Sequence, residues 1–190
     1  MTYVFQKAVR ADIQSIIEIA DMHYYTLGPS GFLVSKYDYR TVSNKINNPN
    51  SIVFVTKIKD TGEVVAFIII TTIYHSGLLN GLTKDDFKWE NIKDKEIFEK
   101  TKHWHMEQGA VKKGYQNKGI GSFYYKEMFN MFPDHSFSSN VISKPIENRA
   151  SLRIKDSHGF HIAAHFESHD YKQLKNYQST LFVRNPQNSF

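Results

Sequence analysis

The stretch from Val111 to Ser122 carries the residues best suited to bind an anion. Its sequence, VKKGYQNKGIGS, follows an apolar strand and leads into a helix predicted to begin near Gly119. Gly119 and Gly121 carry no side chain, so backbone N–H groups there can approach a ligand closely. The first N–H groups of the helix and the positive end of its dipole add to the same site. Together with Lys118, they predict an anion site suited to a pyrophosphate.

Reactive side chains also lie on the strand before this turn, which we predict over 103–111. Alternation gives this strand one face with His103, His105 and Glu107, and a second face with Trp104, Met106 and Gln108. Histidine and glutamate are common general bases. A central strand with such groups on one face needs them paired or lining a polar cavity. Two interpretations stay open: a catalytic base, or structural polar residues that bond each other or neighbouring strands.

The other histidines do not predict a metal site. His158, His161, His165 and His169 are three and four residues apart, as ligands on a helix would be. Gly159 interrupts a helix there, and a strand would scatter these side chains over both faces. The chain also has no cysteine and no acidic cluster nearby. We therefore expect no metal.

Composition narrows the function further. The 190 residues are 41% hydrophobic and 23% charged, which is ordinary for one globular domain with a full core. The net charge of +5 suits a polyanionic small molecule, and the basic residues form no tract for nucleic acid. The absence of cysteine excludes a disulfide framework and a thiol nucleophile. With neither a membrane-spanning run nor a signal-peptide core, we expect a cytoplasmic protein that binds no membrane.

Hydrophobic periodicity and turn residues predict the elements that must position these groups. A single domain over 1–190 is expected, with a mixed sheet and helices on both sides. The predicted strands cover 3–9, 51–57, 63–73, 103–111, 136–143, 160–168 and 177–184. The predicted helices cover 13–25, 37–46, 119–131 and 148–158.

Residues 75–102 form an insertion between the third and fourth predicted strands. The segment is too long for a hairpin loop and carries many charges, with a short helix predicted over 93–100. Three interpretations stay open: a solvated loop, an oligomer contact, or a lid over an acceptor site. If the insertion is an oligomer contact, the protein could form a homodimer.

Two motifs at a matching separation resemble those of the GNAT acetyltransferase superfamily. Gln116-Asn117-Lys118-Gly119-Ile120-Gly121 resembles its pyrophosphate signature, Gln/Arg-x-x-Gly-x-Gly/Ala, and Val111 lies where its fourth strand ends. Asn148-Arg149-Ala150-Ser151, followed by Gly159-Phe160, resembles its second motif. The resemblance implies an α/β fold: a mixed, mostly antiparallel six- to seven-stranded sheet flanked by helices on both sides.

The same resemblance implies transfer of an acetyl group from acetyl-CoA to a primary amine by direct attack. The acceptor would be a small-molecule or peptide amine. By resemblance, the pantetheine arm pairs with Gly109, Ala110 and Val111, and Asn148 and Ser151 face the pantetheine or the phosphates. The pyrophosphate cradle would comprise Gln116, Asn117, Lys118, Gly119, Ile120, Gly121 and Ser122.

The attacking amine must lose a proton, since alkylamines are mostly protonated near pH 7. His105 aligns with the glutamate base of some relatives, which makes it our first candidate base, with Glu107 the second. Lys155 stands where the family usually has a tyrosine proton donor, and it could donate a proton or hold a phosphate. Tyr171, Tyr124 and Tyr125 are alternative donors. This departure supports a rival interpretation, a catalytically silent coenzyme A-binding or sensing module.

Overall fold

The computed structural model describes residues 1–24, 33, 35–72, 84–99, 102–171 and 174–186. Residues 25–32 lie outside these ranges, as do residues 75–83 of the predicted insertion. In the described part of the chain, no helix is long and apolar enough to cross a membrane.

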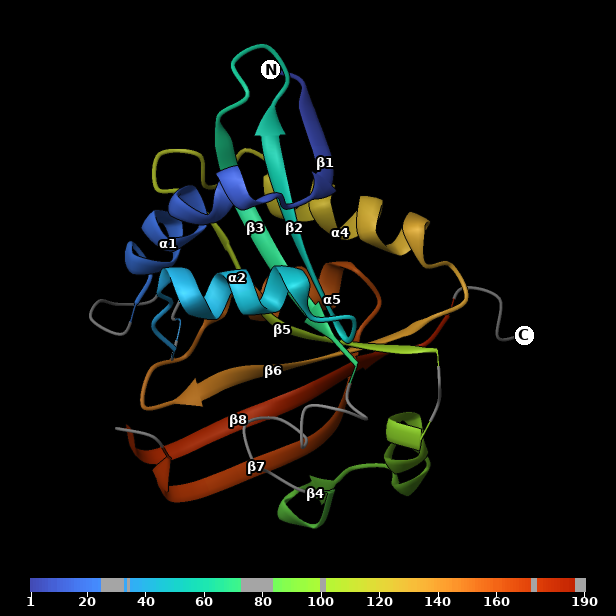
Figure 1. The fold of residues 1–190 in the computed structure, drawn as a ribbon. Helices are drawn as coiled ribbons and strands as arrows, with labels where there is room; N and C mark the ends of the chain where they lie inside the picture. The colour runs from blue at the N-terminus through green and yellow to red at the C-terminus, as the bar shows by residue number, and fades with distance from the viewer. Residues whose placement is uncertain (25–32, 34, 73–83, 100–101, 172–173, 187–190) are drawn as a thin grey trace.

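One mixed sheet forms the centre of the fold (Figure 1). Within the described residues it has eight strands in the order β1-β2-β3-β5-β6-β8-β7-β4. The sequence predicted six or seven strands. Only β5 and β6 pair in parallel; the other neighbours are antiparallel. The strands are β1 (Tyr3–Lys7), β2 (Ser51–Ile58), β3 (Val64–Thr71), β4 (Lys88–Trp89), β5 (His103–Val111), β6 (Ser136–Lys144), β7 (His161–Tyr171) and β8 (Leu174–Arg184).

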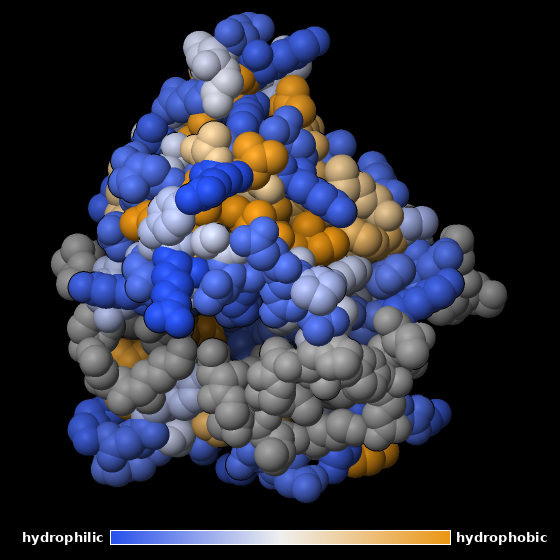
Figure 2. Space-filling view, in the orientation of Figure 1, coloured by the Kyte–Doolittle hydropathy of each residue, from blue (hydrophilic) through white to orange (hydrophobic). Residues whose placement is uncertain are grey.

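Helices cover both faces of the sheet, as predicted (Figure 1). α1 (Ile13–Asp21) and α2 (Tyr39–Asn47) pack on one face, where a core cluster joins Ile16 and Val42 to Ile69 of β3. α4 (Ile120–Met131) and α5 (Arg149–Ser157) cover the other, where Tyr125 and Met128 join the second cluster. Hydrophilic side chains dominate the outward face of α1 and α2 (Figure 2), as expected for helices with one apolar stripe.

The central strand β5 is irregular at the point that matters for function. It pairs with β6 only over His103–His105, opposite Ser136–Ser138. Beyond His105 the two strands diverge (Figure 1). On its other side β5 pairs with β3, and the register shifts so that Met106 faces Ile70 while Gln108 faces Ile69. Glu107 is therefore the extra residue of a β-bulge, which bends a strand and redirects its side chains.

The described part of the insertion docks on the sheet edge rather than forming a free loop. It contains η3 (Lys84–Asp86), β4 and η4 (Ile92–Glu99), a 3₁₀ helix near the short helix predicted there. The two-residue strand β4 pairs with β7, and it was not predicted because two residues carry no periodicity. His161 and His165 of β7 lie 3.1 and 3.3 Å from carboxylate oxygens of Asp94 and Glu90. These contacts fix the segment against β7.

Candidate active site

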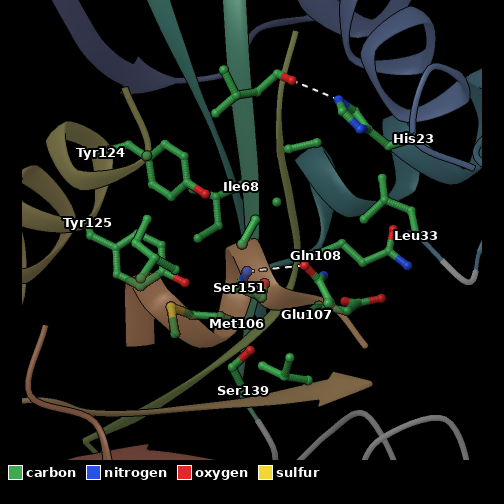
Figure 3. Close-up of a pocket in the computed structure, with 18 of the residues that line it drawn as sticks. His23, Leu33, Ile68, Met106, Glu107, Gln108, Tyr124, Tyr125, Ser139 and Ser151 are labelled. Carbon is green, nitrogen blue, oxygen red and sulfur yellow. Dashed lines mark hydrogen bonds between the residues drawn. The ribbon is translucent and has the colours of Figure 1, made fainter. Parts of the chain in front are cut away.

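A cavity of about 900 Å³ runs from the glycine turn into the gap between β5 and β6. Tyr124 and Tyr125 of α4 lie on one side, whereas Leu33 and His23 lie on the other (Figure 3). The cavity brings together thirteen of the fifteen residues that the sequence placed in the site: His105, Glu107, Gly109, Ala110, Val111, Gln116, Asn117, Gly119, Ile120, Gly121, Ser122, Asn148 and Ser151. Lys118 and Lys155 do not line it.

The glycine turn presents an uncapped helix N-terminus to this cavity. Gly119 is the N-cap of α4, with a φ of 77°, a left-handed conformation that glycine adopts without steric cost. No side chain caps the helix there. The N–H groups of Ile120, Gly121 and Ser122 precede the first intrahelical bond, from Phe123 N to Gly119 O, and so have no partner within the helix. These N–H groups lie where the sequence predicts an anion site, whereas the ammonium of Lys118 lies over the Tyr115 ring, 5.1 Å from its centre.

Gly121 packs closely against α5. A Cβ at this position would lie 2.8 Å from Cδ1 of Ile154 on α5, well inside van der Waals contact. An added methyl group would therefore require the Ile154 side chain to shift.

The free edge of β5 offers alternate backbone groups to the gap. Lys112 N donates to Val65 O on β3, so Lys112 and, two residues earlier, Ala110 direct their backbone polar groups at β3. Gly109 and Val111 point toward β6, where no strand pairs with them. Our expectation for Ala110 is thus wrong in detail, because its N–H and C=O are directed at Phe67. His23 Nε2 donates to Val111 O at 2.7 Å, which leaves the Val111 N–H and both Gly109 groups for a ligand.

The second motif serves as a helix cap. Asn148 is the N-cap of α5, and its Oδ1 accepts a hydrogen bond from Ser151 N at 3.1 Å (Figure 3). Such a bond satisfies one of the free N–H groups at the helix start. The motif therefore orients the N-terminus of α5 toward the cavity.

His105 is buried at the start of the gap and is 5% exposed. The Ser138 hydroxyl oxygen lies 2.8 Å from His105 Nδ1 and 2.9 Å from His103 Nε2. A hydroxyl has one proton, so it donates to one ring while the other ring donates to it. Burial, followed by the nearby charges of His103, Lys155 and Lys45, lowers the pKa of His105 well below 6.5. The imidazole is therefore neutral at pH 7 and has a free Nε2.

Glu107 lies in an ion pair at the cavity wall. Its Oε2 is 2.5 Å from the ammonium of Lys45 on α2, and both side chains are about one quarter exposed. The bulge also corrects the predicted faces of β5. Gln108 pairs with Ile69, whose side chain packs toward α1 and α2, so it does not share a face with Trp104 and Met106. Figure 3 shows Glu107 and Gln108 close together on the Leu33 side.

Lys155, predicted to donate a proton or hold a phosphate, is buried and does not line the cavity. It is 1% exposed, and its Nζ lies 2.8 Å from the Tyr125 hydroxyl and 3.9 Å from Met106 Sδ. Burial lowers its pKa well below 10.5. A lysine on an amphipathic helix is usually solvated, which is why the sequence did not reveal this burial.

The lining residues that the sequence did not place in the site include three with polar side chains near β5: His23, Lys45 and Gln108. His23 follows α1 and Lys45 lies on α2, both far from β5 in the chain, and neither has a motif that marks it. Gln108 was assigned to the wrong face because alternation does not reveal a bulge. Among the residues that the structure describes, no group of three or more metal-ligating side chains is placed to hold a metal ion.

The geometry is that of a protein that binds an extended, phosphate-bearing ligand between two splayed strands. The family model described as "Acetyltransferase (GNAT) family" matches residues 13–160, most of the chain, and the protein belongs to that family. The resemblance found in the sequence is thereby confirmed. A search of curated proteins gave no significant match.

Solved structures with the same fold agree with this assignment. Arabidopsis thaliana NAA60, in complex with a bisubstrate analogue, superposes with a TM-score of 0.68 at 14% identity, covering 99% of this chain and 100% of that one. yncA from Salmonella typhimurium, a putative acetyltransferase solved with acetyl-CoA, gives 0.65 at 17% identity, covering 99% and 96%. The ribosomal-protein-S18-alanine N-acetyltransferase from Escherichia coli gives 0.65 at 11%, covering 100% and 99%. At such identities the likeness establishes the fold.

Proposed function

We propose that this protein is an acetyl-CoA-dependent N-acetyltransferase that acts on a primary amine by direct attack. The observation that carries the proposal is the continuity of one cavity. It joins the uncapped N-terminus of α4 to His105 and Glu107 at the start of the gap between β5 and β6. An anion-binding end and a basic end are thus held in one site.

Different residues along this cavity suit different parts of acetyl-CoA. Acetyl-CoA would supply the acetyl thioester. The N–H groups of Ile120–Ser122 suit its pyrophosphate, and Gly109 and Val111 suit the amides of its pantetheine arm. A backbone N–H on the same edge of β5 can donate to the carbonyl oxygen as negative charge develops there. The chain has no cysteine to carry the acetyl group, which favours direct attack by the amine.

His105 and Glu107 are the proposed proton acceptors. If His105 donates through Nδ1 to Ser138, its Nε2 keeps a lone pair for the amine proton, directly or through water. Ser138 would then donate to His103, so that all three side chains have consistent roles. Glu107 carries negative charge beside the same cavity and would attract a cationic amine. A cytoplasmic location, where acetyl-CoA is available, completes the proposal.

A coenzyme A-binding module without turnover is the second candidate. The observation that favours it is the burial of Lys155 away from the cavity, at the position of the tyrosine expected by resemblance. Release of free coenzyme A separates the two functions. The purified protein would be given acetyl-CoA and a panel of amino acids, amino acid amides, aliphatic amines, polyamines and peptides. Sustained, acceptor-dependent release supports the transferase. Tight acetyl-CoA binding by calorimetry with no release for any acceptor would favour the binding module.

A further inference from the structure

The ion pair between Lys45 and Glu107 places both signs of charge on the wall of the cavity. Lys45 comes from α2 and Glu107 from the bulge of β5, 62 residues apart, and both side chains line the cavity. Each is about one quarter exposed, so the pair is sheltered but reachable. A charge left unpaired in such a place is costly, so a ligand that replaces this ion pair must bring one group of each sign.

The charge inventory of the cavity argues against a polycationic acceptor. Among the described lining residues, Glu107 is the single carboxylate, and the cations are Lys45, Arg149 and Arg153. The two arginines lie on α5, whose N-terminus faces the predicted phosphate end. The acceptor end therefore offers one negative and one positive group, the pattern that suits a zwitterion.

Two carboxamide oxygens are available for additional hydrogen bonds. Gln108 Oε1 and Asn140 Oδ1 are buried, and neither has a hydrogen-bond partner among the described residues. Both side chains line the cavity, Gln108 from β5 and Asn140 from β6 across the gap. Buried polar atoms are usually paired, so these oxygens point to a ligand with N–H donors. An ammonium group has three.

The remaining walls of the acceptor end are apolar or aromatic. Leu33 lies on the same side as Glu107 and Gln108, and Ile142 and Tyr177 come from β6 and β8. Such surfaces accommodate a hydrophobic group next to the charged pair.

We propose that the acceptor is an α-amino carboxylate, a free amino acid with an apolar or aromatic side chain. Its amine faces the Glu107 carboxylate and the Gln108 and Asn140 oxygens, and its carboxylate pairs with the Lys45 ammonium. The side chain contacts Leu33, Ile142 and Tyr177. This inference rests on the proposed function, since it names the substrate class for the same site.

Three acceptors with the same ring test the role of the carboxylate: L-phenylalanine, L-phenylalaninamide and 2-phenylethylamine. The carboxylate is present in the first, neutralised in the second and absent in the third. Coenzyme A release would be measured for the wild type, Lys45→Met, Lys45→Arg and the control Lys88→Met. Lys88 is a largely exposed lysine paired with Glu167, and it does not line the cavity.

We expect the wild type and Lys88→Met to prefer phenylalanine over both analogues. In Lys45→Met the ratio of kcat/KM for phenylalanine to that for 2-phenylethylamine should fall about ten- to hundredfold, the worth of a charge-assisted hydrogen bond. Lys45→Arg should restore much of this ratio. A merely structural Lys45 would lower kcat/KM for all three acceptors equally, and that result would overturn the inference.

The outcomes separate this inference from the proposed function. Turnover of the amide, the simple amine or other panel members, without turnover of amino acids, would overturn the substrate class and leave the N-acetyltransferase intact. No release with any amine of the full panel would overturn both.

Discussion

The Lys155 amine lies 2.8 Å from the Tyr125 hydroxyl, and both groups are buried between α4, α5 and β5. Burial lowers the pKa of Lys155 well below 10.5 and raises that of Tyr125 well above 10.0. Burial thus favours the uncharged form of each side chain, and a hydrogen bond between the amine and the hydroxyl satisfies both buried groups. This pair has consequences that can be measured.

Replacing one partner of the pair should lower the free energy of unfolding more than replacing both. Tyr125→Phe leaves the buried Lys155 amine without its oxygen partner, so the free energy of unfolding should fall by about 1–3 kcal/mol. Adding Lys155→Met removes the unpaired group and should recover most of that loss. Urea denaturation of the two single variants and the double variant would measure the coupling. Additive losses would contradict a direct interaction.

Lowering the pH from about 10.5 should decrease the stability of the wild type through Lys155. The unfolded lysine binds its proton up to about pH 10.5, whereas the folded one loses it at lower pH. Stability therefore decreases as the pH falls from 10.5 toward the folded pKa, because the unfolded state binds more protons. In Lys155→Met this contribution disappears, so its stability relative to the wild type should rise as the pH falls through that window. Lys126→Met, at an exposed position of α4, is the matched control, and the same slope in both variants would refute the assignment.

Gly121 should tolerate a methyl group only when Ile154 is shortened. Gly121→Ala places a Cβ 2.8 Å from Ile154 Cδ1, which should cost about 1–3 kcal/mol of stability through overpacking. Ile154→Val removes that Cδ1 atom, so the double variant should be more stable than Gly121→Ala alone. Thermal denaturation measures both. If the second substitution only adds its own loss, the contact is not the reason for the glycine.

Gly119 should affect ligand affinity beyond its effect on folding. A Cβ there meets no atom within 4 Å, so the fold has room, and the left-handed φ of 77° costs Gly119→Ala about 1–2 kcal/mol. A bound pyrophosphate would occupy the open space. We therefore expect calorimetry to show at least a tenfold loss of acetyl-CoA affinity in the folded variant. Unchanged affinity for acetyl-CoA would show that the glycine turn is not part of the cofactor site.

His105 should matter most at neutral pH. His105→Ala is expected to lower kcat/KM at pH 7 by about 10²–10⁴-fold, and the loss should shrink at higher pH, where the amine deprotonates unaided. Because burial lowers the pKa of His105 well below 6.5, the wild-type rate should fall through protonation of this base only at lower pH than for a solvent-exposed imidazole. A pH–rate profile, with the exposed His169→Gln as control, measures both effects. An intact rate at pH 7 would exclude the role.

The sequence predicted the features that depend on local pattern. The strand over 103–111 has the predicted bounds, and the helix after Gly119 begins within one residue of its predicted start. Turn glycines and an Asx cap such as Asn148 act on their neighbours in the chain, so their signals are local. Such local signals predicted the cofactor end of the site.

The acceptor end was less accessible to prediction because it depends on contacts between distant elements. The bulge at Glu107 is set by the register against β3, which one strand's alternation does not contain. Lys45 reaches this strand from α2, and nothing near it in the sequence indicates a partner 62 residues away. The burial of Lys155 depends on Tyr125 and Met106, again from other elements.

The short contact between β5 and β6 gives the sheet an unusual mechanical property. In the described part of the chain, the ladder between β5 and β6 has three residue pairs, and it is where β1, β2, β3 and β5 meet β6, β8, β7 and β4 in the sheet. Beyond this ladder the two halves are held together by a shared core that includes Met106 and Phe137, and the cavity opens where the strands diverge. A ligand that contacts both halves of the sheet would add bonds across this opening. Ligand binding should therefore make the whole sheet stiffer. Slower amide hydrogen exchange on β1 and β2, which contribute no residue to the cavity lining, would report that stiffening away from the ligand.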